Sequence, residues 1–374
     1  MNDREILDKL KKLRSQDTDF SKGRVFSAVS TIPSDVSLEA FRIFADTNAL
    51  DEHLFSTTRK LETDCISWLG ELLHNTDAVG YVTTGGTEAN MFALWAAKEN
   101  NKNKNEIIVP ESAHYSFEKI ARVMSLKINH VGLDENFRAN VAEIERKINS
   151  KTLAVVATAG TPSLEKVDPV SEINELCDDV FLHVDAAFGG FVIPFLDDEI
   201  KSRFKFDFEL SNVSSVTIDP HKMGGAPFPS GAVLVRNNEL LKNLKIYPPY
   251  IPIETYTLLG TRSGGAIAAT WATLNSVGVS GYKKIVGRCM ENTRFFSSEL
   301  KKRGFELVTE PDLNCIGVKI NGMEIVKKLE DLGWKVSMNH KPKSLRIIVM
   351  SHVNKENILE FIDDLEKIVN EIKN

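Results

Sequence analysis

The chain has 374 residues, of which 42% are hydrophobic and 26% are charged. This composition is typical of a globular protein with one large core or two smaller ones, and it excludes disordered and fibrous chains. The formal net charge of −6, from 46 basic and 52 acidic residues, does not favour nucleic acid or an anionic membrane as a partner.

The first twenty residues have the pattern of a polar, amphipathic helix rather than of a signal peptide, with one apolar stripe formed by Ile6, Leu7, Leu10 and Leu13. No apolar stretch is long enough to span a membrane. The four cysteines are far apart and lack CxxC spacing, which argues against a zinc knot or a disulfide scaffold. We therefore expect a cytoplasmic protein, and we expect residues 1–55 to form an extended N-terminal arm that packs on something else.

Seven candidate strands follow, separated in many places by amphipathic helical stretches. Several are continuous apolar runs such as "LAVVAT", which is how a strand buried on both faces reads. This alternation predicts a large α/β domain over residues 56–262 with a mostly parallel, seven-stranded sheet. The candidate strands are residues 81–84, 106–110, 128–131, 153–158, 181–185, 216–218 and 232–235.

The pattern changes after about residue 262. A long helical stretch at 266–300 is followed by the apolar run "NCIGVKI", a helix at 323–332, the run "LRIIVM" and a last helix from residue 355. These elements predict a smaller C-terminal α+β domain over residues 263–374.

Glycines stand where the first strand runs into a helix, in "YVTTGGTEANMFAL" (81–94). Gly85, Gly86 and Thr87 let the backbone approach a ligand closely, and the free N–H groups of a helix N-terminus favour a phosphate. The same letters also make an ordinary N-cap turn, so the motif alone leaves both interpretations open.

An aspartate ends another strand, in "VFLHVDAAFGGF" (180–191). Asp185 is costly there unless it meets a buried cation or a protonated ring nitrogen, although it is also placed to cap the next turn. His183 shares its strand face, but no further ligand is near in sequence, so we expect no metal site.

The stretch "VTIDPHKMGG" (216–225) places Lys222 just beyond a strand and before two glycines. A lysine that reaches solvent explains this position, and so does a lysine placed for carbonyl chemistry. Lys222, Asp185, the glycine turn, His114 and Thr158 all fall at carboxyl ends of predicted strands, where open α/β sheets bind ligands. Together they suggest pyridoxal 5'-phosphate, with a lysine Schiff base and a carboxylate that keeps the pyridine nitrogen protonated.

The motifs "TTGGTEAN", "AHYSFEK", "ATAGT", "HVDAAFGGFVIPF", "TIDPHKMG", "LLGTR" and "LRIIVM" occur in this order from about residue 56 to the end of the chain. On these residues the sequence resembles the group II pyridoxal-dependent amino-acid decarboxylases, and most closely their archaeal L-tyrosine/L-aspartate decarboxylase subfamily. The resemblance implies a PLP-dependent transferase fold of type I, similar to aspartate aminotransferase. It also implies the loss of CO2 from an L-amino acid.

The resemblance implies a role for each matching residue. Lys222 would hold the cofactor covalently and Asp185 would pair with its ring nitrogen. His114 would stack on one face of the ring and Ala187 would support the other. The remaining contacts to the phosphate and the ring hydroxyl would come from Gly86, Thr87, His221 and Thr158.

Three more residues carry expectations about substrate and assembly. Arg346 matches the arginine that binds the substrate α-carboxylate, as a bidentate guanidinium does well. Thr261 matches a position that reaches the phosphate from the neighbouring subunit, which implies a homodimer with shared active sites. Tyr250 lies in a segment rich in Pro and Tyr, which suits either a lid carrying a catalytic tyrosine or a packed dimer interface.

The substrate is expected to be L-aspartate, giving β-alanine for coenzyme A synthesis, or L-tyrosine, giving tyramine for methanofuran synthesis. The arm departs from the family where relatives form the side-chain pocket, reading "VSTIPSDV" at 29–36 and "NALDEHLF" at 48–55. Thr31 and His53 are candidates there for contacting the distal group of the substrate, and either is equally compatible with a surface position. Pro162 also replaces the second threonine of the usual "GTT".

Other readings remain in view from the sequence alone. Another PLP-dependent carbon–carbon lyase, acting on a phosphorylated amino alcohol, would share the lysine and aspartate but would need additional basic groups. An aminotransferase or desulfurase would share them too, but the "DPHK" letters favour the decarboxylase branch. A non-catalytic scaffold would be expected to lose Lys222 or Asp185, and both are present.

Overall fold

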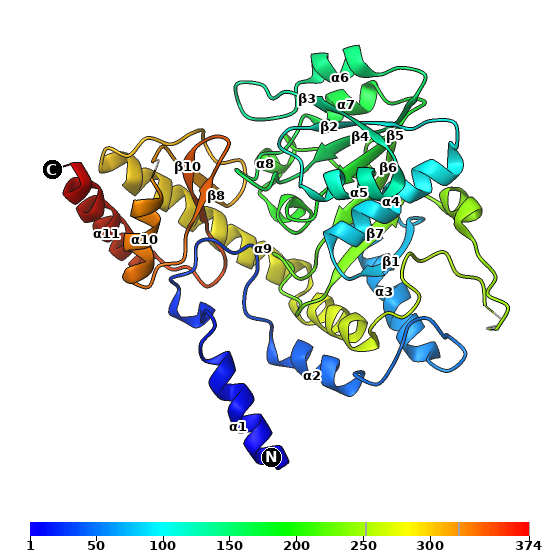
Figure 1. The fold of residues 1–374 in the computed structure, drawn as a ribbon, viewed down its shortest axis with the longest axis horizontal. Helices are drawn as coiled ribbons and strands as arrows, with labels where there is room; N and C mark the ends of the chain where they lie inside the picture. Colours follow the sequence, from blue (N-terminus) through cyan, green and yellow to red (C-terminus); the bar gives the residue numbers. More distant parts are fainter. Residues whose placement is uncertain (251–252, 321, 374) are drawn as a thin grey trace.

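The computed structural model describes residues 1–250, 253–320 and 322–373. A large sheet with helices on both faces and a small sheet with two helices lie side by side (Figure 1). The long helix α9 (Gly264–Lys302) runs from one to the other. None of the described helices combines the length and the apolar character needed to cross a bilayer.

The large sheet has seven strands in the order β1-β7-β6-β5-β4-β2-β3. Only β7 runs against its neighbours, so the predicted mostly parallel, seven-stranded sheet is confirmed. The strands are β1 (Val79–Thr83), β2 (Glu106–Pro110), β3 (Lys127–Val131), β4 (Thr152–Thr158), β5 (Phe181–Asp185), β6 (Val213–Ile218) and β7 (Gly231–Val235).

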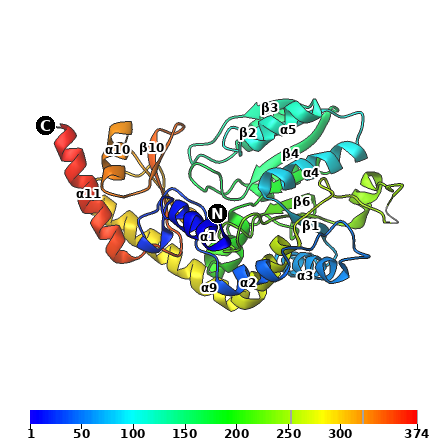
Figure 2. The ribbon, with the colours of Figure 1, turned by 60° about the horizontal axis from the view of Figure 1, so that its bottom comes forward.

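Apolar residues on alternate faces of these strands build two cores. On β2, Ile107 belongs to the core beneath α4 and α5, and Ile108 to the core beneath α3, α7 and α9. Figure 2 shows α4 and α5 on one side of the sheet and α3 and α9 on the other. The covering helices are α3 (Ser56–Leu72), α4 (Gly86–Asn100), α5 (Ser116–Met124), α6 (Val141–Lys147), α7 (Val170–Glu175) and α8 (Asp198–Lys201), with short 3₁₀ turns at Gly189–Phe191, Ile193–Phe195 and Asn238–Leu244.

The small sheet is antiparallel in the order β8-β10-β9. Its strands are β8 (Cys315–Val318), β9 (Ser337–Asn339) and β10 (Ser344–Ile348), and its helices are α10 (Met323–Asp331) and α11 (Lys355–Lys373). Phe26 of the arm is buried in this core, stacked on Trp334 at a centroid distance of 5.5 Å. Part of the arm is therefore built into the small part of the same chain.

The arm differs from the expected extended segment. It contains α1 (Asp3–Arg14), the 3₁₀ turn Phe20–Lys22 and α2 (Asp35–Ile43), which packs on α9. Ser34 caps α2 with its hydroxyl, a signal that is present in the sequence. Helix α1 has no buried residue and projects from the body (Figure 1). Its apolar stripe of Ile6, Leu7, Leu10 and Leu13 is thus exposed.

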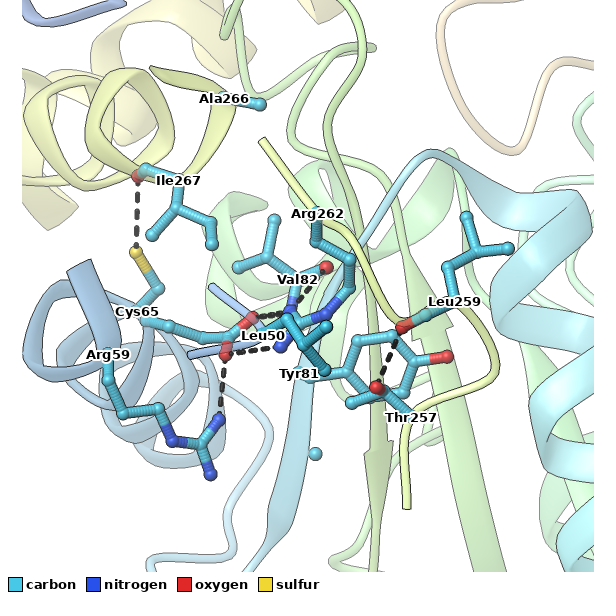
Figure 3. A network of polar contacts seen from close by, with 12 residues as sticks. Leu50, Arg59, Cys65, Tyr81, Val82, Thr257, Leu259, Arg262, Ala266 and Ile267 are labelled. Carbon is cyan, nitrogen blue, oxygen red and sulfur yellow. Dashed lines mark hydrogen bonds and ion pairs between the residues drawn. The ribbon is translucent and has the colours of Figure 1, made fainter. Parts of the chain in front are cut away.

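A buried ion pair ties the end of the Pro- and Tyr-rich segment to the sheet. Arg262 donates hydrogen bonds to the carboxylate of Glu62 on α3, which also accepts the backbone N–H of Val82 at 3.0 Å. Figure 3 shows Arg262 against Tyr81, with its guanidinium 4.9 Å from the ring centroid. The neighbouring Thr261 is thereby held in place, but its side chain is exposed.

Candidate active site

One cavity of about 690 Å³ lies at the carboxyl ends of β4, β5 and β6, with a wall contributed by β10 and by residues 27–30 of the arm. The structure brings together ten of the candidate ligand-binding residues named from the sequence. They are Gly85, Gly86, Thr87, His114, Thr158, Asp185, Ala187, His221, Lys222 and Arg346.

Lys222 stands in a tight turn that follows β6, and its side chain lines the cavity instead of reaching bulk solvent. Nζ lies 3.2 Å from Oδ2 of Asp219. Gly225 has φ +77° in this turn, and a Cβ at Gly224 would meet the carbonyl oxygen of Pro220 at 2.5 Å. The two glycines therefore allow the turn that places Lys222 in the lining of the cavity.

Asp185 is 4% exposed at the end of β5. Its Oδ1 accepts the backbone N–H of Ala187 at 3.1 Å and its Oδ2 accepts from Nδ2 of Asn90 at 2.9 Å. Four acceptor positions on a carboxylate leave room for one more donor, such as a protonated ring nitrogen from a ligand. The position suits an ionised carboxylate facing the cavity.

His183 supports Asp185 through Asn90. The Asn90 amide donates to Asp185, so its oxygen accepts Nε2–H of His183 at 3.0 Å, and Nδ1 then accepts the hydroxyl of Ser215 at 2.8 Å. Burial lowers the pKa of His183 to about 4, so the ring is neutral. Both ring nitrogens are occupied, and no cluster of three potential metal ligands occurs among the described residues.

His114 follows β2, and its Nδ1 accepts the backbone N–H of Ser116 at 3.2 Å. Burial lowers the pKa of His114, although Asp185 opposes the shift, so the imidazole is neutral above its ordinary pKa. A neutral, partly buried ring lining the cavity is suited to lie flat on an aromatic ligand. Ala187 lines the same cavity with only a methyl group.

The N-terminus of α4 opens into the cavity without a side-chain cap, so its first N–H groups lack partners within the helix. A Cβ at Gly86 would lie 3.0 Å from Oδ2 of Asp219 and 3.4 Å from Cβ of Ala187. Nδ1 of His221 accepts the backbone N–H of Ser230 at 3.1 Å, which leaves Nε2 as the donor. This is a place for an anionic group.

Two buried polar atoms indicate that the cavity is shaped for a ligand. Oγ1 of Thr158 and Oδ1 of Asp219 have no hydrogen-bond partner within the described part of the chain. Such atoms are rare in native proteins unless a ligand or water completes them. With the N-terminus of α4, Asp185 and Lys222, they fit a ring bearing a phosphate, an oxygen substituent, a protonated nitrogen and an aldehyde, as in pyridoxal 5'-phosphate.

Two candidates for substrate selection and two for catalysis and cofactor binding lie outside this cavity. Thr31 contacts Ser351 and His352, and His53 is exposed on the surface, so neither side chain lines the cavity of its own chain. Residues 27–30 of the arm line the cavity instead. Tyr250, 80% exposed, and the exposed Thr261 also lie outside the cavity of their own chain.

Several side chains that line the cavity were not singled out in the sequence, and Asn90, Asp219 and Glu165 are the ones that bear on its chemistry. Asn90 stands one helical turn after Gly86, inside the quoted motif "TTGGTEAN", and this spacing was a usable signal. Asp219 is the first letter of "DPHK". For Glu165 no local pattern pointed to the site.

Comparison with known proteins agrees with this geometry. The profile of the pyridoxal-dependent decarboxylase conserved domain matches residues 26–321. The chain is 40% identical to "Probable L-aspartate decarboxylase" of Archaeoglobus fulgidus, covering 98% of this chain and 99% of that protein. It is 39% identical to "Probable L-tyrosine/L-aspartate decarboxylase" of Methanosarcina mazei, covering 100% and 98%.

Solved structures agree on the fold. The Burkholderia pseudomallei sphingosine-1-phosphate lyase superposes with a TM-score of 0.90 at 22% identity, covering 99% of this chain and 91% of that one. This likeness concerns the fold, and it confirms the expected PLP-dependent transferase architecture. The profile match and the full-length relatives establish that the chain belongs to the pyridoxal-dependent decarboxylase family.

Proposed function

We propose that this chain decarboxylates L-aspartate or L-tyrosine, the two amino acids named in its archaeal relatives. The family is one of PLP-dependent amino-acid decarboxylases, and pyridoxal 5'-phosphate is its cofactor. The observation that carries the proposal is the meeting of Lys222, Asp185 and Arg346 in one cavity. An amine, a buried carboxylate and a guanidinium are what a carboxyl-removing PLP site requires.

Each of these side chains has a proposed task. Lys222 holds the cofactor aldehyde until an amino acid replaces it, and Asp185 keeps a proton on the ring nitrogen. His114 and Ala187 keep the ring flat between them. When bound, the protonated ring supplies the sink for the electrons of the bond that breaks.

The phosphate and the ring oxygen have their own partners in this proposal. Gly86 and Thr87 offer backbone N–H groups, and His221 offers its Nε2–H, to the phosphate. The hydroxyl of Thr158, which has no hydrogen-bond partner among the described residues, would form a hydrogen bond with the ring oxygen. These contacts would hold the ring in one orientation, so that the substrate is oriented relative to a fixed cofactor.

Arg346 is proposed to bind the substrate carboxylate. It lies on β10, its side chain is 14% exposed, and its Nε has no hydrogen-bond partner among the described residues. A guanidinium that holds a carboxylate fixes which bond of Cα stands perpendicular to the ring. The small part of the chain therefore orients the substrate, and the large part binds the cofactor.

The amine product identifies the substrate. The holoenzyme is incubated separately with L-aspartate, L-tyrosine and L-glutamate, and CO2 and the amine formed are measured. β-Alanine is the expected product from aspartate, which would connect the enzyme to coenzyme A synthesis, and tyramine from tyrosine, which would connect it to methanofuran synthesis. The proposal fails if neither amine forms, and CO2 release from none of the three would favour a different lyase or a scaffold.

We propose further that the active enzyme is a homodimer with shared sites. Thr261 and Tyr250 lie on the surface of their own chain, beside the exposed apolar residues Ile246 and Tyr247. Exposed aromatic residues in one segment are typical of an interface. In a dimer this segment would bring Thr261 to the partner's phosphate and Tyr250 to the mouth of the partner's cavity.

Mixing two inactive variants tests the shared site. Lys222→Ala lacks the amine and Thr261→Glu places a negative charge against the phosphate, so each homodimer should be inactive. A mixed dimer contains one site of two with both Lys222 and Thr261 intact. Since about half of the dimers reassociated from an equal mixture are mixed, about a quarter of the wild-type activity should return. If activity does not return although mixed dimers are detected by mass, the sites are not shared.

A further inference from the structure

Glu165 lines the same cavity and has no task in the proposed decarboxylation. It lies in the loop between β4 and α7, and its side chain is 1% exposed. Neither carboxyl oxygen has a hydrogen-bond partner in the described ranges of the chain. A buried carboxyl group without a partner is costly, so its partner is to be sought in the ligand that fills the cavity.

Glu165 and Arg346 approach each other without closing into a hydrogen-bonded pair. Oε1 of Glu165 lies 4.0 Å from Nη2 of Arg346, which is beyond hydrogen-bond distance. Nε of Arg346 is buried and also unpaired among the described residues. Two groups of opposite type in the cavity lining thus lack hydrogen-bond partners among the described residues, and one ligand group placed between them can satisfy both.

The backbone at Glu165 supports a functional reason for this side chain. Its φ is +50°, a left-handed conformation that glycine and asparagine adopt more readily than glutamate. The N–H of Glu165 donates to the carbonyl oxygen of Thr161 at 2.7 Å, which fixes the turn. Strained residues of this kind gather at ligand sites, where surrounding structure holds them in place.

The surroundings decide the charge on Glu165. Burial raises the pKa of its carboxyl group to about 8, and the positive charges of Arg346 on β10 and Lys222 after β6 oppose this shift. Cys315 on β8 and Cys289 on α9 lie near it as well, and burial raises the pKa of both thiols, so they add no charge there near neutral pH. Glu165 therefore carries a proton at neutral pH.

We propose that Glu165, in its protonated form, donates a hydrogen bond to the substrate carboxylate that Arg346 binds. This inference rests on the proposed function, since it concerns the same carboxylate. An ionised Glu165 would repel that carboxylate and compete for the guanidinium. Carboxylate binding is consequently coupled to a proton on Glu165, and Arg346 alone does not determine how the leaving carboxylate is held.

Calorimetry with unreactive carboxylates tests the coupling. Succinate and 3-(4-hydroxyphenyl)propanoate are aspartate and tyrosine without the amino group, so neither can displace Lys222. Each is titrated into the PLP holoenzyme from pH 6.5 to 9.5, in two buffers of different ionisation enthalpy, which gives the number of protons taken up for each carboxylate bound. Wild type is expected to take up nearly one proton above the pKa, and its Kd to rise about tenfold for each pH unit there.

Two variants distinguish the effect of the titratable proton on Glu165 from an effect of the substitution on folding. Glu165→Gln keeps a neutral donor, so its Kd should match wild type near pH 7 and stay constant to pH 9.5, and binding should involve no proton uptake at position 165. Glu165→Gly suits the left-handed backbone and should fold, but it loses the donor, so its Kd should be roughly tenfold weaker at pH 7.

Proton uptake of the same size in Glu165→Gln would overturn the inference, as would a Glu165→Gly variant that binds both carboxylates like wild type. Absence of binding to wild-type holoenzyme would overturn it too. These outcomes are independent of the amine assay. An enzyme that makes β-alanine or tyramine without this coupling keeps its proposed function and loses only the role given to Glu165.

Discussion

Lys222→Ala should abolish amine formation, with a fall in kcat of at least about a thousandfold, as expected when a group that bonds covalently to the cofactor is removed. Lys222 is the only lysine among the described residues whose side chain lines the cavity. Alanine cannot bind the cofactor aldehyde, so the variant should hold PLP through non-covalent contacts alone. The visible absorption of the covalently attached cofactor should disappear.

Borohydride reduction followed by mass spectrometry under denaturing conditions gives a second readout. Wild type should retain the mass of the reduced cofactor on the peptide that contains Lys222, and Lys222→Ala should retain none. Lys205→Ala is the control, because Lys205 is exposed and pairs only with the nearby Glu209 among the described residues. A reduced cofactor found on another lysine, with activity preserved, would remove Lys222 from its proposed place.

Most strands of the large sheet were predictable because they are buried on both faces. Runs such as residues 153–158 are apolar throughout, and burial of the whole of β4 agrees with this. The site followed from the same fact, since chemically active residues placed just after buried parallel strands must meet at one edge of the sheet. Lys222 and Asp185, 37 positions apart, come together for this reason (222 − 185).

The sequence was less informative where long-range packing decides the structure. The direction of β7 depends on a short connection after the Lys222 turn. Its apolar residues suit a parallel and an antiparallel strand equally, so the sequence does not reveal that direction. The predicted single helix at 266–300 contains a break at Gly278, with φ +60° and ψ 174°. The placement of the arm depends on Phe26 fitting beside Trp334, a contact between residues that no periodicity connects.

Side chains that act through buried polar contacts were also hidden. Asn90 looks like one polar residue in an apolar helix until its amide is seen between Asp185 and His183. Glu165 lies in a segment whose sequence is typical of a surface loop, and only the three-dimensional structure shows that its side chain is buried. Charged residues are almost never fully buried without a partner, so sequence statistics point away from such a position.

Asp185→Asn should lower kcat on the order of a thousandfold while the protein remains folded. The amide has nearly the same shape as the carboxylate but no negative charge, so it cannot hold a proton on the ring nitrogen. Either orientation of the amide also leaves Asn90 or the N–H of Ala187 without its acceptor. Losing one buried hydrogen bond of this kind costs about 1–3 kcal/mol of stability.

Ser215→Ala is the matched control for Asp185→Asn, because Ser215 belongs to the same buried network but does not line the cavity. It should cost a similar free energy of unfolding in urea and reduce kcat less than tenfold. The charge of Asp185, not the integrity of the network, then accounts for the difference in kcat. If Asp185→Asn keeps more than about a tenth of the wild-type kcat at saturating PLP, a proton held on the ring nitrogen by this residue is not what drives carbon dioxide from the substrate.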